Sequence, residues 1–189
     1  PYATYALDVI QKMKSETSIV LAAWNGYKST FVSATGTEAT SAFSLLVNEF
    51  CRDYELSKNS KLGIPLGKQS LGIQLPEYIE ARNSGFSLEL LRASISSLST
   101  VYNGGSGVGF DDYLVSLDRS TLASSISSRF SGIITKIDSF TGTLEQEMSS
   151  NTVGLDDLYN LLQGQVVSIK TDMSSAFGVL ITYQDNDGD

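Results

Sequence analysis

Apolar side chains recur at steps of three and four residues along most of the chain, and this helical periodicity constrains the fold more than any other feature. One stripe predicts a single amphipathic helix from an N-cap at Asp118 to Met148. A second stripe predicts another long helix from Leu155 to Leu180. Because only Ser149–Gly154 separates the two, we expect them to pack antiparallel. The first stripe consists of Leu122, Ile126, Phe130, Ile133, Ile137, Phe140, Leu144 and Met148.

Three shorter helices are expected in the first half of the chain. Helical spacing from Val9 to Phe31 ends at a break over Ser33–Thr37, and the spacing resumes from Phe43 to Tyr54. The glycines and prolines of Ser57–Ser87 exclude a regular helix there. A further helix over Leu88–Tyr102, with Ser87 as its N-cap, ends at the Asn103-Gly104-Gly105 turn.

Strand signals are weak, with the sole exception of a short run over Val179–Tyr183. The fold class predicted is therefore all-α. We expect a bundle of about four to five helices with a long irregular loop containing Gly and Pro, forming a single domain over residues 1–189.

Composition excludes several classes of function. The chain has no histidine, which rules out a Ser-His-Asp triad or an HExxH zinc site within it. Its 13 basic and 21 acidic side chains give a formal net charge of −8, which argues against nucleic acid as a partner. The lone Cys51 cannot form an intrachain disulfide and is expected to be a buried small hydrophobe. No apolar run reaches transmembrane length.

The start at Pro1, without methionine or signal sequence, suggests a processed or excised piece.

Several groups of oxygen donors are candidates for cation binding, and each also has a plain structural interpretation. The tail Asp185–Asp189 resembles the start of a calcium loop but lacks the EF-hand register and the closing glutamate. Tyr102–Gly109 lacks the strand and lysine of a phosphate-binding loop, which favours a turn between helices. The other candidates, for which solvated or core positions are favoured, are the pairs Glu77/Glu80, Asp111/Asp112 and Glu145/Glu147 and the phenols of Tyr102, Tyr113 and Tyr183.

Five ordered elements carry a family resemblance. The sequence reads Lys61-Leu62-Gly63-Ile64-Pro65-Leu66-Gly67, then Pro76-Glu77 with Glu80, then Ser84-Gly85-Phe86-Ser87, then Val101-Tyr102-Asn103-Gly104, and it closes with Phe177–Thr182 and Asp187-Gly188-Asp189. In this order they resemble the KLG-x-PLG, PE-x-x-E, SG-x-S, VY-x-G and LGV-x-I-T…DGD elements of the imelysin-like family. The resemblance covers essentially the whole chain but corresponds only to the C-terminal half of the family.

The resemblance implies an all-helical protein of two bundle-like halves, exported to the bacterial periplasm or outer-membrane surface, often as a lipoprotein, and implicated in iron uptake. Some relatives are classed as peptidases. The family's GxHxxE signature belongs to the N-terminal half, and without histidine it is not present here. The family's functional site lies between the halves. Matched residues that would line this side of the cleft are Glu80, Ser84, Ser87, Tyr102 and Asn103.

An alternative interpretation of these loops stays open, because Gly63, Gly67, Gly85 and Gly104 could serve backbone geometry alone. No catalytic residue and no metal ligand is assigned within the chain, so an enzymatic role is not expected from it alone.

Three hypotheses of function follow. The first is an exported binding component of iron uptake, for free iron, haem or a siderophore, whose site is completed by the N-terminal half of the same protein. The second is a metallopeptidase of the same family, and the third is a metal-free helical module that binds a surface partner. Loss of a partner bundle would expose apolar surface, which predicts a homodimer.

Overall fold

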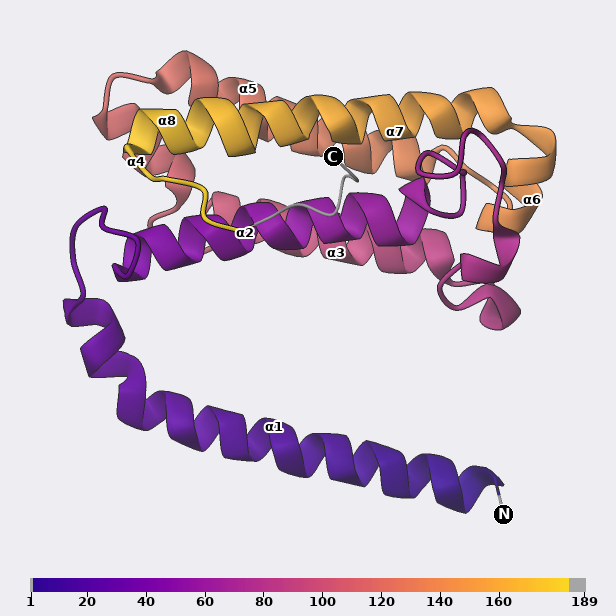
Figure 1. Cartoon of the computed structure of the whole chain (residues 1–189), viewed down its shortest axis with the longest axis horizontal. Coiled ribbons are helices and arrows are strands. Elements are labelled where there is room, and N and C mark those ends of the chain that lie inside the picture. The colour runs from indigo at the N-terminus through magenta and orange to yellow at the C-terminus, as the bar shows by residue number, and fades with distance from the viewer. Residues whose placement is uncertain (1, 184–189) are drawn as a thin grey trace. The chain divides into compact units, whose positions relative to one another are not determined.

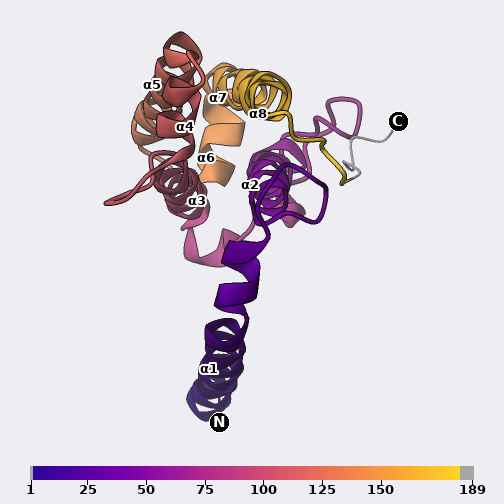
Figure 2. The ribbon, with the colours of Figure 1, turned by 90° about the vertical axis from the view of Figure 1, so that its left-hand side faces the viewer.

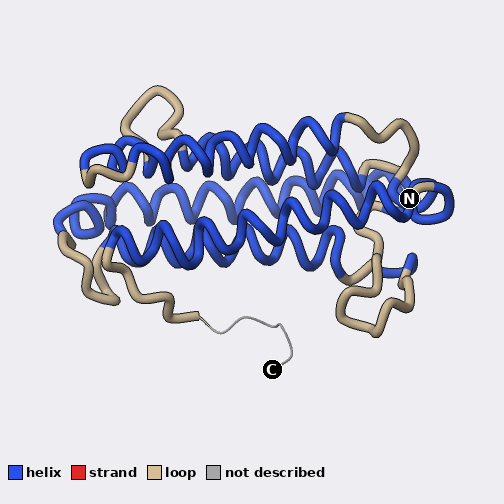
Figure 3. The backbone as a smooth tube through the Cα atoms, turned by 90° about the horizontal axis from the view of Figure 1, so that it is seen from above, coloured by secondary structure: helices blue, strands red, loops and turns tan. Residues whose placement is uncertain are grey.

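A computed structural model describes residues 2–183, and all regular structure in that range is helical (Figure 3). This confirms the all-α prediction. The number of helices exceeds the four to five expected, because two predicted elements are divided and a short one was missed. The α-helices are α1 (Tyr2–Ser33), α2 (Ala42–Lys58), α3 (Ser87–Tyr102), α4 (Phe110–Ser116), α5 (Ser120–Asp138), α6 (Leu144–Ser150), α7 (Thr152–Val166) and α8 (Ser174–Phe177).

The contacts divide the chain into two compact units, one up to Leu45 and one from Leu46 onward. The boundary falls within α2. The single domain over residues 1–189 stays a prediction. No helix in the described range is long and apolar enough to cross a membrane.

The first unit consists mainly of α1, which has no buried residue. Near its C-terminal end, Trp24, Tyr27 and Phe31 follow helical spacing, and their ring centroids lie 5.2–6.2 Å apart. The helix ends at Ser33, inside the break that the sequence predicts. At the following turn, the hydroxyl of Ser41 accepts a hydrogen bond from the N–H of Ser44 at 3.1 Å, which caps the start of α2.

The second unit is built around four long helices, α2, α3, α5 and α7, that run alternately up and down (Figures 1 and 2). Phe130 of α5 lies at the centre of the core, within 5.8–6.4 Å of the rings of Phe50, Tyr54 and Tyr102. The Tyr54 hydroxyl donates to the carbonyl of Leu162 on α7 at 3.1 Å, so the buried phenol is satisfied.

Cys51 is fully buried, as expected. Burial, followed by the nearby charge of Glu55, raises the pKa of its thiol to about 12. A thiol with so high a pKa is almost entirely protonated at neutral pH, and Cys51 is therefore an inert core residue.

The prediction of one helix from Asp118 to Met148 is wrong. The chain leaves the helix after Asp138, and a new helix, α6, starts at Leu144. Thr143 caps α6: its hydroxyl accepts from the N–H of Gln146 at 3.3 Å, while the Gln146 side chain accepts from the N–H of Thr143 at 2.8 Å. This capping box marks the start of a new helix, although the apolar stripe continues across it. Asp118 is not the N-cap, because it has a positive φ of 58° and Arg119 precedes the helix.

The second long stripe forms one rod, made of α7, a π-helical segment over Val167–Met173, and α8. It packs antiparallel to α5, as predicted, but the connection between them is longer than expected and contains α6 (Figure 1). The rod ends at Phe177, before the predicted Leu180, because Gly178 adopts a left-handed conformation with φ of 66°. Val179–Tyr183 forms no strand. The acidic tail Asp185–Asp189 lies outside the described residues.

At the two ends of α3, the expected N-cap was wrong, and the expected helix end at Asn103-Gly104-Gly105 is confirmed. Ser87 is the first residue of α3 and not its N-cap; Phe86 occupies the cap position, and the Ser87 hydroxyl donates to the carbonyl of Glu80. The glycine-rich turn after Tyr102 leads into α4, whose first turn is held by Asp112: its carboxylate accepts from the N–H of Gly109 at 3.1 Å. Apolar spacing did not predict this helix, because it has only seven residues.

Candidate functional site

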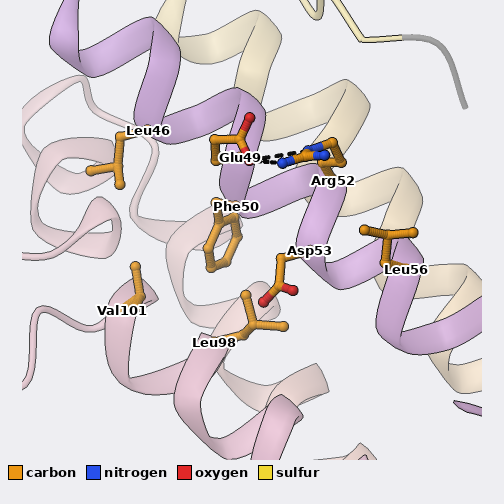
Figure 4. Close-up of a pocket in the computed structure, with 8 residues that line it drawn as sticks. All are labelled: Leu46, Glu49, Phe50, Arg52, Asp53, Leu56, Leu98 and Val101. Atoms are coloured by element: carbon orange, nitrogen blue, oxygen red, sulfur yellow. Dashed lines mark hydrogen bonds and ion pairs between the residues drawn. The ribbon is translucent and has the colours of Figure 1, made fainter. Parts of the chain in front are cut away.

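A groove runs between α2 and α3 on the second unit, and it consists of two adjoining pockets. The first has a volume of about 300 Å³ (Figure 4). The second has a volume of about 550 Å³ and is more polar. Asp53 and Leu56 line both pockets, which makes the groove continuous. The first pocket is otherwise lined by Leu46, Glu49, Phe50, Arg52, Leu98 and Val101, and the second by Ser57, Ser60, Lys61, Tyr78, Glu80 and Ser94.

The irregular loop between α2 and α3 closes the polar end of this groove. Buried Leu62, Leu66 and Ile79 anchor the loop to the bundle. Gly67 has a φ of +77°, and a Cβ there would lie 2.3 Å from the carbonyl oxygen of Ile73, so only glycine fits this close approach of two backbone segments. The loop thereby brings Glu80 back to the end of α2.

Glu80, Ser84 and Ser87 lie at this end of α3. The Glu80 carboxylate forms an ion pair with Lys61. The hydroxyls of Ser87 and Ser84 donate to the carbonyls of Glu80 and Ala81, respectively. Both serines therefore hold the loop conformation, and Glu80 is the member of this group whose charged side chain lines the groove.

Tyr102 and Asn103 lie at the opposite end of α3, about 24 Å away along a helix of 16 residues. The Tyr102 side chain is fully buried, and its hydroxyl donates to the carbonyl of Ala123 at 3.1 Å. Burial, followed by the charge of Asp111, raises the pKa of this phenol, which disfavours the phenolate that would ligate ferric iron. Asn103 is the C-cap of α3, and its side-chain oxygen accepts from Ser127 at 3.4 Å. The five candidate residues therefore lie in two groups at opposite ends of α3 and do not form one cluster.

Most of the remaining candidate oxygen donors are engaged in the fold, whereas the side chain of Glu77 is exposed. Asp111 and Asp112 bond backbone N–H groups at the start of α4. Glu145 forms an ion pair with Arg82, and Glu147 accepts the N–H groups of Thr141 and Gly142. Among the phenols, Tyr113 stacks on Phe177 with centroids 5.1 Å apart, and Tyr183 donates to Glu55 at 2.7 Å.

Within residues 2–183, no three side chains of the types His, Cys, Asp and Glu gather into a group that could hold a metal ion.

Most glycines of the matched loops serve backbone geometry, which is the alternative interpretation of these motifs. Gly67, Gly85 and Gly104 all have positive φ, between 71° and 77°, which other residues rarely adopt. Gly63 differs: it lies in a π-helical turn, where a Cβ would meet the ring of Tyr159 at 3.1 Å. These glycines shape the loops, and the loops in turn place Glu80.

Sequence reasoning missed the groove itself. Leu46, Glu49, Asp53 and Leu56 recur at helical spacing on one face of α2, and this mixture of apolar and acidic positions is a signal that could have been found. Their partners on α3 could not be inferred, because the two helices are separated by a long irregular segment.

The comparison with protein families decides which family this helical chain belongs to. The family model described as Imelysin matches residues 1–173. The chain belongs to the imelysin family. This agrees with the resemblance of the loop motifs around Glu80 and Tyr102. No curated protein and no solved structure matches the chain.

Proposed function

We propose that this imelysin-family chain is the C-terminal half of an exported binding component of bacterial iron uptake, whose ligand site is completed by an N-terminal half that carries the GxHxxE signature. Two observations taken together support this proposal. The chain belongs to the imelysin family, and its described residues contain no cluster of three metal-ligating side chains. A site shared between two halves accounts for both facts.

In this proposal, the polar end of the α2–α3 groove faces the ligand. Glu80 supplies a carboxylate oxygen, which suits a hard cation such as iron. Its ion pair with Lys61 fixes the carboxylate and offsets part of its charge. Lys61 and Tyr78 would also contact the anionic groups of a haem or siderophore. The proposed location, the periplasm or the outer-membrane surface with a lipid anchor, rests on the family resemblance alone.

The test is an iron titration by calorimetry on the 189-residue chain, repeated after addition of the family's N-terminal half. We expect heat of binding only when both halves are present. Glu80→Gln should weaken that binding about tenfold, whereas Glu89→Gln, an exposed carboxylate on the outside of α3, should leave it unchanged.

The other outcomes would each change the conclusion. Stoichiometric binding by the chain alone would place the ligands among its own carboxylates. No binding of iron, haem or siderophore by the mixed halves would favour the metal-free interaction module. Cleavage of a protein substrate by the mixed halves, abolished by a chelator, would favour the metallopeptidase.

A further inference from the structure

The aromatic end of α1 presents an exposed apolar face. Trp24 and Tyr27 are 41% and 49% exposed, and Phe31 is half-buried. The three rings lie on one side of the helix, since they are three and four residues apart. Aromatic side chains of this kind dominate the energy of protein interfaces when a partner covers them.

The α2–α3 groove is the complementary feature on the same chain. Leu46 and Val101 are both 44% exposed on its walls, and Phe50 and Leu98 form its floor (Figure 4). The face of α2 that lines the groove extends about 15 Å from Leu46 to Leu56, and Trp24 to Phe31 extends about 11 Å along α1. The groove is thus long enough to receive the whole aromatic cluster of one helix.

Helix α1 and residues 46–183 also carry net charges of opposite sign. Residues 2–33 carry three lysines and two carboxylates, whereas residues 46–183 carry 10 basic and 15 acidic side chains. Lys28 lies beside the aromatic cluster in sequence, and Asp53 points into the groove (Figure 4). Neither of these two has an ion-pair partner in the described chain, whereas the neighbouring Glu49 and Arg52 pair with each other.

We propose that α1 of one copy docks through Trp24, Tyr27 and Phe31 into the α2–α3 groove of a second copy, and that the exchange is reciprocal. Each copy then contributes one helix and one groove, as a closed two-fold dimer requires. Lys28 of each copy faces Asp53 of the other. This goes beyond the proposed iron function, because it concerns the apolar part of the groove and needs no ligand.

The test uses charge reversal and sedimentation velocity over a wide range of concentration. The unaltered chain should sediment as a dimer that dissociates on dilution. Lys28→Glu and Asp53→Lys should each weaken the dimer about tenfold, because each places like charges opposite one another.

Mixing the two variants should restore the dimer. In the mixed pair, the carboxylate introduced at position 28 of one copy faces the ammonium group introduced at position 53 of the other. The second contact of the same pair keeps its original Lys28 and Asp53, so opposite charges meet at both places.

Two controls test whether the change in dimerisation is specific to the contact between Lys28 and Asp53. Lys14→Glu makes the same charge change about four turns away on α1 and should alter the dimer by less than about twofold. Circular dichroism of every variant should match that of the unaltered chain, because all the substituted side chains are exposed. A chain that is monomeric at every concentration, equal effects at Lys14 and Lys28, or no recovery on mixing would each overturn the proposal.

Discussion

Glu147 is a buried carboxylate that holds the corner between α5 and α6. It accepts the Asn151 side-chain amide and the N–H of Gly142, both at 2.9 Å, and the N–H of Thr141 at 3.2 Å. These hydrogen bonds, led by that of Asn151, lower the pKa of Glu147. The side chain thus satisfies backbone groups that the break in the helix leaves without partners.

Replacing this carboxylate should be costly and pH-dependent. We expect Glu147→Gln to reduce the free energy of unfolding at pH 7 by about 1–3 kcal/mol, because a neutral amide is a weaker acceptor and brings an extra donor. A depressed folded-state pKa stabilises the protein above the unfolded pKa of about 4.3, and this stabilisation is lost as the pH falls through the folded value. The difference between variant and parent should therefore shrink below about pH 4.

Urea unfolding followed by circular dichroism at several pH values measures this. The matched control is Asp172→Asn, which removes the same charge from an exposed position and should change stability by about 0.5 kcal/mol or less. A Glu147→Gln effect that stays constant from neutral to acid pH would contradict the hydrogen-bonding role.

At the scale of elements, the capping box at Thr143 decides that α6 is separate from α5. Thr143→Ala should destabilise the second unit by about 1 kcal/mol, because it leaves the N–H of Gln146 without its acceptor. Thr143→Ser keeps the oxygen and should retain most of that stability. Thermal unfolding of the two variants compares them directly, and equal losses would show that the threonine methyl group, rather than the cap, is responsible.

The same corner shows how far the sequence could predict the elements. Apolar spacing identified α1, α2, α3, α5 and the long rod of α7 and α8, because each repeats its apolar residues on one face. It failed between Asp138 and Leu144, since Phe140 and Leu144 continue the stripe across the break. Both α5 and α6 face one core, so the pattern does not reveal a corner that is specified by the hydrogen bonds of Thr143 and Glu147.

The candidate site was predictable only where its residues are close in sequence. Glu80, Ser84 and Ser87 were identified together because one loop carries all three. Tyr102 and Asn103 were grouped with them, but the length of α3 separates the two sets. Asp53 and Lys61 join Glu80 only after α2 and the loop pack against α3, and local spacing holds no information about that contact.

At the scale of the whole molecule, the second unit should fold without α1. Its buried aromatic core lies entirely from Leu46 onward, and α1 contributes no buried residue. A chain that starts at Ala34 should retain cooperative unfolding, with a melting temperature within a few degrees of the parent at concentrations where the parent is monomeric. It should also fail to dimerise.

Circular dichroism melts and sedimentation of the shortened chain provide both readouts. Loss of a cooperative transition would mean that α1 supports the bundle. Dimerisation at the parent's strength would mean that another surface joins the copies. The intact chain at matched concentration is the reference for both measurements.

The position of Trp24 also determines what intrinsic tryptophan fluorescence can report about this protein. It is the only tryptophan in the sequence, and it lies on α1, in the first unit. Its fluorescence therefore follows the surroundings of that one helix, including the approach of a second copy. At concentrations where the chain is monomeric, unfolding of the second unit, whose buried rings are phenylalanines and tyrosines, would leave the tryptophan signal nearly unchanged. Intrinsic fluorescence is thus a sensitive measure of docking and a poor measure of whether the core is folded.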